Sequence, residues 1–144
     1  MSPRTPTLWV GAIAALIVGI TVAGVSRWGL ADRQPSRRHD VMLLYVGAED
    51  CAPCRTWQRG AGAAFHLAPE FAQLTYREVK SPSLLDVLKD EHWSEDLRGY
   101  RDQLGKGAGV PLWLVISDRE IVERGFGASQ WASAVLPKLK SLLR

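Results

Sequence analysis

The chain has 144 residues and a net charge of +3, which leaves room for one domain with its own core once the apolar N-terminus is set aside. The positive charge lies before position 40, where five arginines stand against one aspartate, whereas the remaining 13 basic and 14 acidic residues give −1. A domain so close to neutral excludes the basic surface of a nucleic-acid-binding protein.

The N-terminus contains a long uncharged segment, residues 5–26, whose central part is almost wholly apolar. As a helix this segment spans about 33 Å, which is enough to cross a hydrocarbon core of about 30 Å. Its length favours an uncleaved anchor over a signal peptide, for which Ala23 and Ala31 mark candidate cleavage sites. Trp9 and Trp28 flank the segment as interfacial aromatic residues do. We therefore expect residues 1–31 to be a signal-anchor or signal peptide.

The orientation of this segment depends on how its flanking arginines are counted. Four arginines come after the segment and Arg4 precedes it, so the positive-inside rule taken literally would keep the domain in the cytoplasm. Three of these four arginines lie within residues 32–40, a polar, proline-containing stretch that predicts a linker. N-terminal segments of this kind usually export the domain attached to them. We expect residues 41–144 on the periplasmic or extracytoplasmic face of the cytoplasmic membrane, N-terminally anchored, or secreted if the segment is cleaved.

The chain's only two cysteines, Cys51 and Cys54, lie between a predicted strand and a predicted helix. Residues 41–46 form a continuous apolar run typical of a buried strand, and residues 52–67 predict a helix. Cys51 then stands at the helix start, where unpaired backbone N–H groups and the helix dipole stabilise a thiolate. Cys54 is close enough to close a disulfide and act as the resolving thiol, and Pro53 suits the first helical turn.

A metal site and a structural disulfide are the alternatives for this pair. Zinc needs about four ligands, but only His39, His66 and His92 remain, and none shows the usual histidine spacing. A structural disulfide closing so short a loop gains little chain entropy. A redox pair is therefore preferred, while a Cu(I) or zinc carrier that uses the cysteines with His66 or His92 stays open.

The rest of the chain predicts a further strand, a helix, a hairpin and a last helix. Residues 73–79 alternate imperfectly and predict a strand. Ser81 and Pro82 suit the start of a helix that continues to about residue 104, with or without a break near Trp93. The leucines expected on one face of this helix are Leu84, Leu85 and Leu88.

A glycine-rich loop over residues 105–109 leads into two strands at 111–116 and 120–124, joined by a short turn. Residues 129–142 predict a helix whose apolar face holds Trp131, Val135, Leu139 and Leu142. The expected fold is α/β, in the order β-α-β-α-β-β-α, with a mixed central sheet and helices on both faces.

This order, with a C-x-x-C pair after the first strand, resembles the thioredoxin-like superfamily over residues 41–144. Val110-Pro111 stands just before the third strand, where such proteins carry a cis X-Pro bond against the cysteine pair. Phe126-Gly127-Ala128 closes the hairpin where thioredoxins carry a hydrophobic-Gly-Ala sequence beside the active site. The resemblance implies catalytic cysteines and a neighbouring surface that binds substrate. The catalytic pair is Cys51 and Cys54, and the substrate-binding residues are Val110, Pro111, Ala52 and Pro53.

The sequence departs from the thioredoxin pattern around the pair. Asp50 replaces the tryptophan common before the first cysteine, and with Glu49 it is expected to raise the pKa of the Cys51 thiol. Arg55 would offset these charges. Tyr45 occupies the place of the buried acid that many thioredoxins use, so proton transfer to the resolving cysteine would need water, Glu49 or Asp50.

The leading functional hypothesis is a thiol–disulfide oxidoreductase that reduces disulfides of exported proteins. It would need no cofactor, and a membrane-borne electron donor would restore the dithiol, because an exported domain lacks the cytosolic reducing pool. Similar proteins serve cytochrome c maturation, sulfur-oxidation enzymes or general disulfide repair. The main alternative is a binding module that docks a partner beside Val110-Pro111 without turnover.

Overall fold

The computed structural model of the protein describes residues 40–144. The expected membrane segment over 1–31 and nearly all of the linker over 32–40 lie outside these residues, so both remain expectations. Within residues 40–144, no helix combines the length and the apolar character that a membrane crossing requires.

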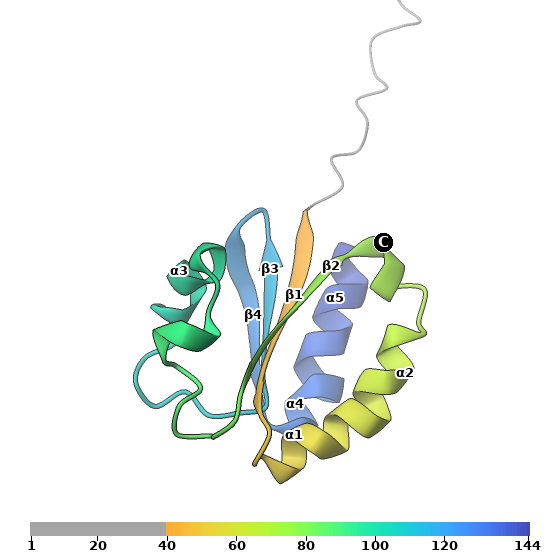
Figure 1. Ribbon diagram of the computed structural model, residues 1–144. Coiled ribbons are helices and arrows are strands. Elements are labelled where there is room, and N and C mark those ends of the chain that lie inside the picture. Colours follow the sequence, from red (N-terminus) through yellow and green to blue (C-terminus); the bar gives the residue numbers. More distant parts are fainter. Residues whose placement is uncertain (1–39) are drawn as a thin grey trace, which may run out of the picture. The chain divides into compact units, whose positions relative to one another are not determined.

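A mixed four-stranded sheet in the order β2-β1-β3-β4 forms the centre of the described domain (Figure 1). Its strands are β1 (Val41–Ala48), β2 (Thr75–Ser81), β3 (Leu112–Ser117) and β4 (Glu120–Phe126). β1 pairs parallel with β2 and antiparallel with β3, which pairs antiparallel with β4. The two central strands are buried almost throughout, which explains their continuous apolar sequence. The four predicted strands are confirmed, with β2 beginning two residues later than expected.

Two long helical segments cover one face of the sheet (Figure 1). The first joins α1 (Ala52–Trp57), the π-helical turn η1 (Gln58–Gly62) and α2 (Ala63–His66). The second joins α4 (Ala128–Gln130), the π-helical turn η5 (Trp131–Val135) and α5 (Leu136–Leu142). Both helical predictions are confirmed. The buried side chains of this face include Trp57, Phe65, Trp131, Val135 and Leu139.

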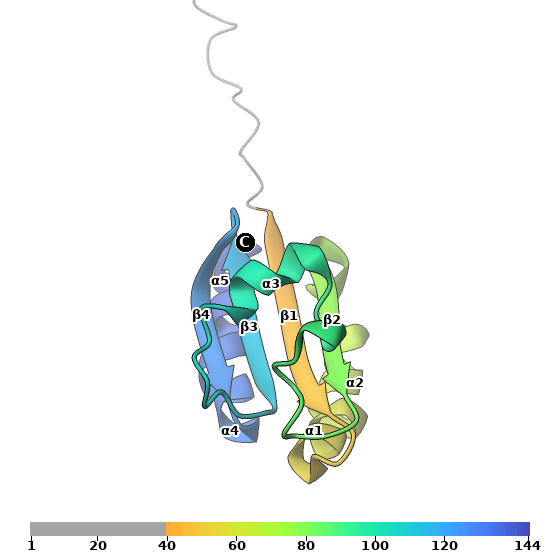
Figure 2. The same ribbon diagram turned by 60° about the vertical axis from the view of Figure 1, so that its left-hand side comes forward.

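The opposite face is covered by residues 82–111, and here the predicted helix is wrong (Figure 2). Residues 82–89 form turns, followed by the 3₁₀ turns η3 (Asp90–His92) and η4 (Glu95–Leu97) and the short helix α3 (Arg98–Arg101). Ser81 does not cap a helix, because it is the last residue of β2 and pairs with Ala48 of β1. Its hydroxyl donates to the Ser83 carbonyl at 2.6 Å. The expected leucine face is also wrong, since Leu85 is 92% exposed.

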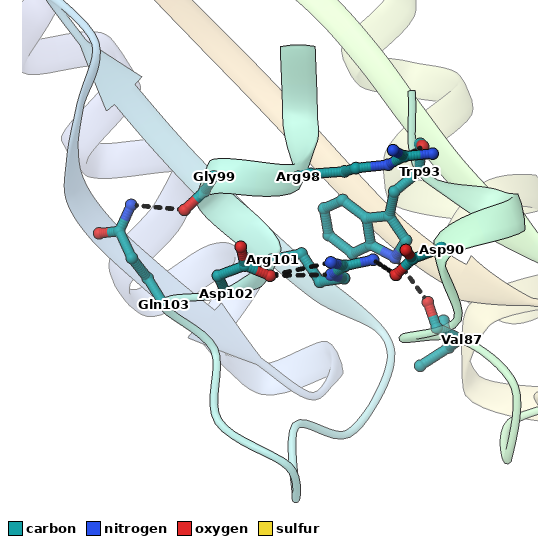
Figure 3. A network of polar contacts seen from close by, with 8 residues as sticks. All are labelled: Val87, Asp90, Trp93, Arg98, Gly99, Arg101, Asp102 and Gln103. Carbon is teal, nitrogen blue, oxygen red and sulfur yellow. Dashed lines mark hydrogen bonds and ion pairs between the residues drawn. The ribbon is translucent and has the colours of Figure 1, made fainter. Parts of the chain in front are cut away.

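Trp93 anchors this covering segment (Figure 3). Its side chain is 2% exposed and packs with Val87 and Leu97 in a second hydrophobic core, which lies between this segment and the sheet. The indole Nε1 donates to the Val87 carbonyl at 2.7 Å. Arg101 forms ion pairs with Asp90 and, at 2.9 Å, with Asp102. A buried aromatic residue and a small polar network therefore hold the segment in place of the regular helix that was expected.

Candidate active site

Cys51 and Cys54 form a disulfide at the start of the first helical segment, with their Cα atoms 5.2 Å apart. Cys51 is the N-cap of α1 and has extended backbone torsions, and its carbonyl accepts a hydrogen bond from the Arg55 N–H at 3.2 Å. Its Sγ accepts a hydrogen bond from the Cys54 N–H at 3.1 Å. The same N–H would stabilise a thiolate on Cys51 after reduction, as helix N-termini do.

Both sulfur-bearing residues are buried in this disulfide form. Cys51 is 2% and Cys54 0% exposed, and they pack with Ala48 and the partly buried Val110. Exchange requires direct contact between sulfur atoms. Access to Cys51 therefore depends on movement of the groups that cover it, Val110 among them.

The peptide between Val110 and Pro111 is cis, and it lies at the end of the sheet where the cysteines are. Leu112, the next residue, pairs with Val46 on one side and Phe126 on the other. The Pro111 carbonyl accepts a hydrogen bond from the Gly127 N–H at 2.9 Å. The structure thus brings Val110 against the cysteine pair, while the substrate-binding roles of Val110, Pro111, Ala52 and Pro53 stay predictions.

The charged residues around the pair make contacts with the backbone. The Arg55 guanidinium donates to the Glu49 carbonyl, and the Glu49 N–H donates to the Ser81 carbonyl at 2.9 Å. The Asp50 Oδ1 accepts the Leu84 N–H at 2.8 Å across 34 residues of sequence. These contacts tie the C-x-x-C loop to the end of β2 and to the segment after it. A role of Glu49, Asp50 and Arg55 in tuning the cysteine pKa remains a prediction.

Tyr45 is fully buried and packs against the first helical segment. Its ring stacks on Trp57 with centroids 4.8 Å apart, and its Oη accepts a hydrogen bond from the Gln58 Nε2 at 3.1 Å. Gln58 comes one helical turn after Cys54, a link that local sequence patterns do not reveal. Gly47 has to be small, because a Cβ there would lie 2.7 Å from Cζ of Tyr45.

Burial raises the pKa of Tyr45 from 10.0 to about 12, while the Gln58 hydrogen bond lowers it and Glu78 raises it. In the unfolded chain a tyrosine ionises near pH 10. Between these values the unfolded state loses a proton that the folded state keeps, so stability falls as the pH rises through this window. The phenol of the folded protein is therefore neutral at physiological pH.

We expect the alkaline loss of stability to be smaller in Tyr45→Phe than in the wild type, by on the order of 1 kcal/mol. The measurement is urea unfolding of both oxidised proteins at about pH 8 and about pH 11. Tyr76, whose pKa is also raised, first by burial, is present in both proteins. Equal losses of stability in the two proteins would show that ionisation of Tyr45 does not cause the alkaline destabilisation.

Within residues 40–144, neither His66 nor His92 belongs to an assembled metal site. The His66 ring packs against Phe71 and Tyr76, with centroids 4.7 and 4.9 Å away. His92 lies in η3 beside Glu91, and His39 precedes the described residues. Across residues 40–144, no group of three or more histidine, cysteine, aspartate or glutamate side chains is placed to hold a metal ion. The carrier sites considered from the sequence are therefore not assembled.

The strand order β2-β1-β3-β4, the mixed sheet and the C-x-x-C disulfide at the start of the first helix agree with the fold expected from the resemblance to the thioredoxin-like superfamily. No family model matches the sequence, and no curated protein matches it either. Thioredoxin f from spinach chloroplast is 16% identical, with a TM-score of 0.49, over 72% of this chain and 77% of that one. Thioredoxin from Trypanosoma brucei brucei is 18% identical, with a TM-score of 0.48, over 73% of this chain and 77% of that one. The reduced periplasmic thioredoxin SoxS from Paracoccus pantotrophus is 14% identical, with a TM-score of 0.48, over 72% of this chain and 95% of that one.

Proposed function

We propose that the protein is a thiol–disulfide oxidoreductase that reduces disulfides in exported proteins. The observation that carries this proposal is the Cys51–Cys54 disulfide at a helix start, with the Cys54 N–H directed at the Cys51 sulfur. After reduction of this disulfide, the helix start would favour a thiolate on Cys51, and Cys54 is near enough to resolve an adduct.

The proposed reaction has two exchange steps. The Cys51 thiolate attacks one sulfur of the substrate disulfide, whose S–S bond breaks and releases one substrate thiolate. Cys54 then loses its proton and its thiolate attacks the Cys51 sulfur of the mixed disulfide, which releases the second substrate thiolate. The substrate gains two electrons, and the protein is left with the Cys51–Cys54 disulfide seen here.

The proposed setting is the extracytoplasmic side of the membrane. Residues 1–31 would anchor the chain, residues 32–40 would link the anchor to the domain, and residues 41–144 would carry the chemistry. A membrane-borne electron donor would reduce the Cys51–Cys54 disulfide again, because small-molecule reductants are scarce outside the cytoplasm. Such a reductant would serve cytochrome c maturation, sulfur-oxidation enzymes or general disulfide repair.

We expect the protein to accelerate the reduction of insulin by dithiothreitol, and its reduction potential to lie well below that of strong oxidants. The acidic side chains of Glu49 and Asp50 beside Cys51 oppose the stabilisation of a thiolate that a strong oxidant needs. The potential is measured by equilibrating the domain with glutathione buffers. A value near about −120 mV would overturn the reductant assignment. Tight binding of a partner without insulin reduction would instead indicate a binding module.

A further inference from the structure

Large apolar side chains are exposed around the end of the sheet that holds the cysteine pair. Within residues 40–144 they are Leu84, Leu85 and Phe126, which are 46%, 92% and 55% exposed. Ser81, the last residue of β2, pairs with Ala48 just before the C-x-x-C loop, so Leu84 and Leu85 follow β2 at this end of the sheet, whereas Phe126 lies on β4 at the opposite edge. Leu84 and Leu85 are adjacent in the sequence, and exposed apolar groups that lie together mark interaction surfaces more often than scattered ones do.

The turn that carries Leu84 and Leu85 is ordered by hydrogen bonds to Asp50, which precedes Cys51, and within the turn itself. The Leu84 N–H donates to the Asp50 carboxylate at 2.8 Å, and the Leu85 N–H donates to the Ser83 hydroxyl at 3.3 Å. The Glu49 N–H donates to the Ser81 carbonyl at 2.9 Å, which fixes the start of the same turn. The backbone of this turn is therefore ordered while the side chains of Leu84 and Leu85 stay exposed to water, where a partner can reach them.

We propose that Leu84 and Leu85, positioned by Asp50, dock an extended substrate segment that carries an apolar side chain close to its reactive cysteine. This inference rests on the proposed function and names the recognition element of that site. A substrate sulfur has to reach Cys51, which is 2% exposed, so the flanking substrate chain must lie against the neighbouring exposed residues. Asp50 immediately precedes Cys51 and accepts a hydrogen bond from the Leu84 N–H, so this turn is tied to the residue next to the reacting cysteine.

The test compares three disulfides as probes: a disulfide-linked peptide with leucine beside its cysteine, the same peptide with serine in place of leucine, and hydroxyethyl disulfide. Rate constants are measured with the reduced full-length protein and its variants. For Leu85→Ser we expect the leucine-peptide rate, taken relative to hydroxyethyl disulfide, to fall about tenfold, as the burial of one leucine allows. The serine-peptide ratio should stay close to that of the wild type.

Leu67→Ser is the matched control. Leu67 is 89% exposed, like Leu85, but it comes after α2 at the far end of the first helical segment, about 22 Å along the helix from Cys51. Its substitution removes an equally exposed leucine side chain and leaves Leu84 and Leu85 unchanged. All three rate constants should therefore match the wild type, and a loss equal to that of Leu85→Ser would overturn the proposal.

Asp50 variants separate positioning from charge. Asp50→Ala removes the acceptor for the Leu84 N–H, whereas Asp50→Asn keeps a carbonyl acceptor and loses only the charge. We expect Asp50→Ala to lose the preference for the leucine peptide and Asp50→Asn to retain it. Equal effects of the two variants would mean that Asp50 acts through its charge on the thiol chemistry and would overturn its positioning role.

The remaining outcomes distinguish this inference from the proposed function. If the wild type reduces none of the three disulfides, the oxidoreductase assignment fails. If it reduces all three and Leu85→Ser keeps the leucine-peptide preference, only the docking inference fails. Sedimentation of the free proteins completes the test, because a dimer that dissociates on Leu85→Ser would show that a second copy of the chain occupies this surface.

Discussion

Cys51→Ser is expected to lower the rate of insulin reduction by about a thousandfold or more. A serine hydroxyl at this helix start keeps the hydrogen bond from the Cys54 N–H, which lies 3.1 Å from the Cys51 sulfur. It does not ionise near neutral pH and cannot form a disulfide, so the first exchange step has no nucleophile. The rate is measured by the precipitation of reduced insulin in the presence of dithiothreitol.

Cys54→Ser should instead arrest the reaction after its first step. Cys51 still attacks the substrate, but no second thiol releases it, so a mixed disulfide accumulates on Cys51. Non-reducing electrophoresis and mass spectrometry detect the adduct, and the double serine variant provides the blank. Cys51 is the helix-start residue whose sulfur receives the Cys54 N–H, so Cys51→Ser, which leaves only Cys54, should form no adduct. An adduct on Cys51→Ser and none on Cys54→Ser would reverse the roles of the two cysteines.

The parts of the fold that the sequence predicts are those governed by short-range patterns. β1 and β3 are continuous apolar runs because both of their faces are covered. The last helical segment is predicted by the spacing of Trp131, Val135 and Leu139, all of which are buried. The cysteine pair is recognised from its spacing between a strand and a helix.

The parts that the sequence does not predict depend on contacts between distant residues. Leu84, Leu85 and Leu88 have helical spacing, but Ser81 is held in the sheet by Ala48, and the Leu84 N–H is taken by Asp50. These partners lie more than 30 residues upstream, where no local pattern reveals them. Gln58 lies only 13 residues after Tyr45, but it is on a different element, so its hydrogen bond to Tyr45 is likewise not revealed by a local pattern.

The segment over residues 82–111 packs on the core that contains Trp93, and its two ends reach the candidate site. It begins beside Asp50, through the Leu84 N–H, and it ends at Val110, which packs against the cysteine cluster. Short turns supply little stability of their own, because isolated helical turns are marginal in water. The buried side chains of the segment must therefore hold it on the sheet, and Trp93 is the largest of them.

Trp93→Ala is accordingly expected to lower the free energy of unfolding by about 3–5 kcal/mol, a large share of the 5–15 kcal/mol typical of a domain. The substitution empties the space of a side chain that is 2% exposed and leaves the Val87 carbonyl without its donor at 2.7 Å. Trp93→Phe keeps an aromatic ring and loses that donor, so it should cost about 1–2 kcal/mol. Urea unfolding of the oxidised proteins measures both changes.

Leu67→Ala is the matched control for these stability measurements, because its side chain is 89% exposed and should change the free energy of unfolding by less than about 0.5 kcal/mol. Amide hydrogen exchange then shows where stability is lost. If the segment folds together with the sheet, Trp93→Ala accelerates exchange in residues 82–111 and in the central strands β1 and β3 alike. An unchanged unfolding midpoint, with faster exchange confined to residues 82–111, would show that the segment opens independently and that the sheet is stable without its cover.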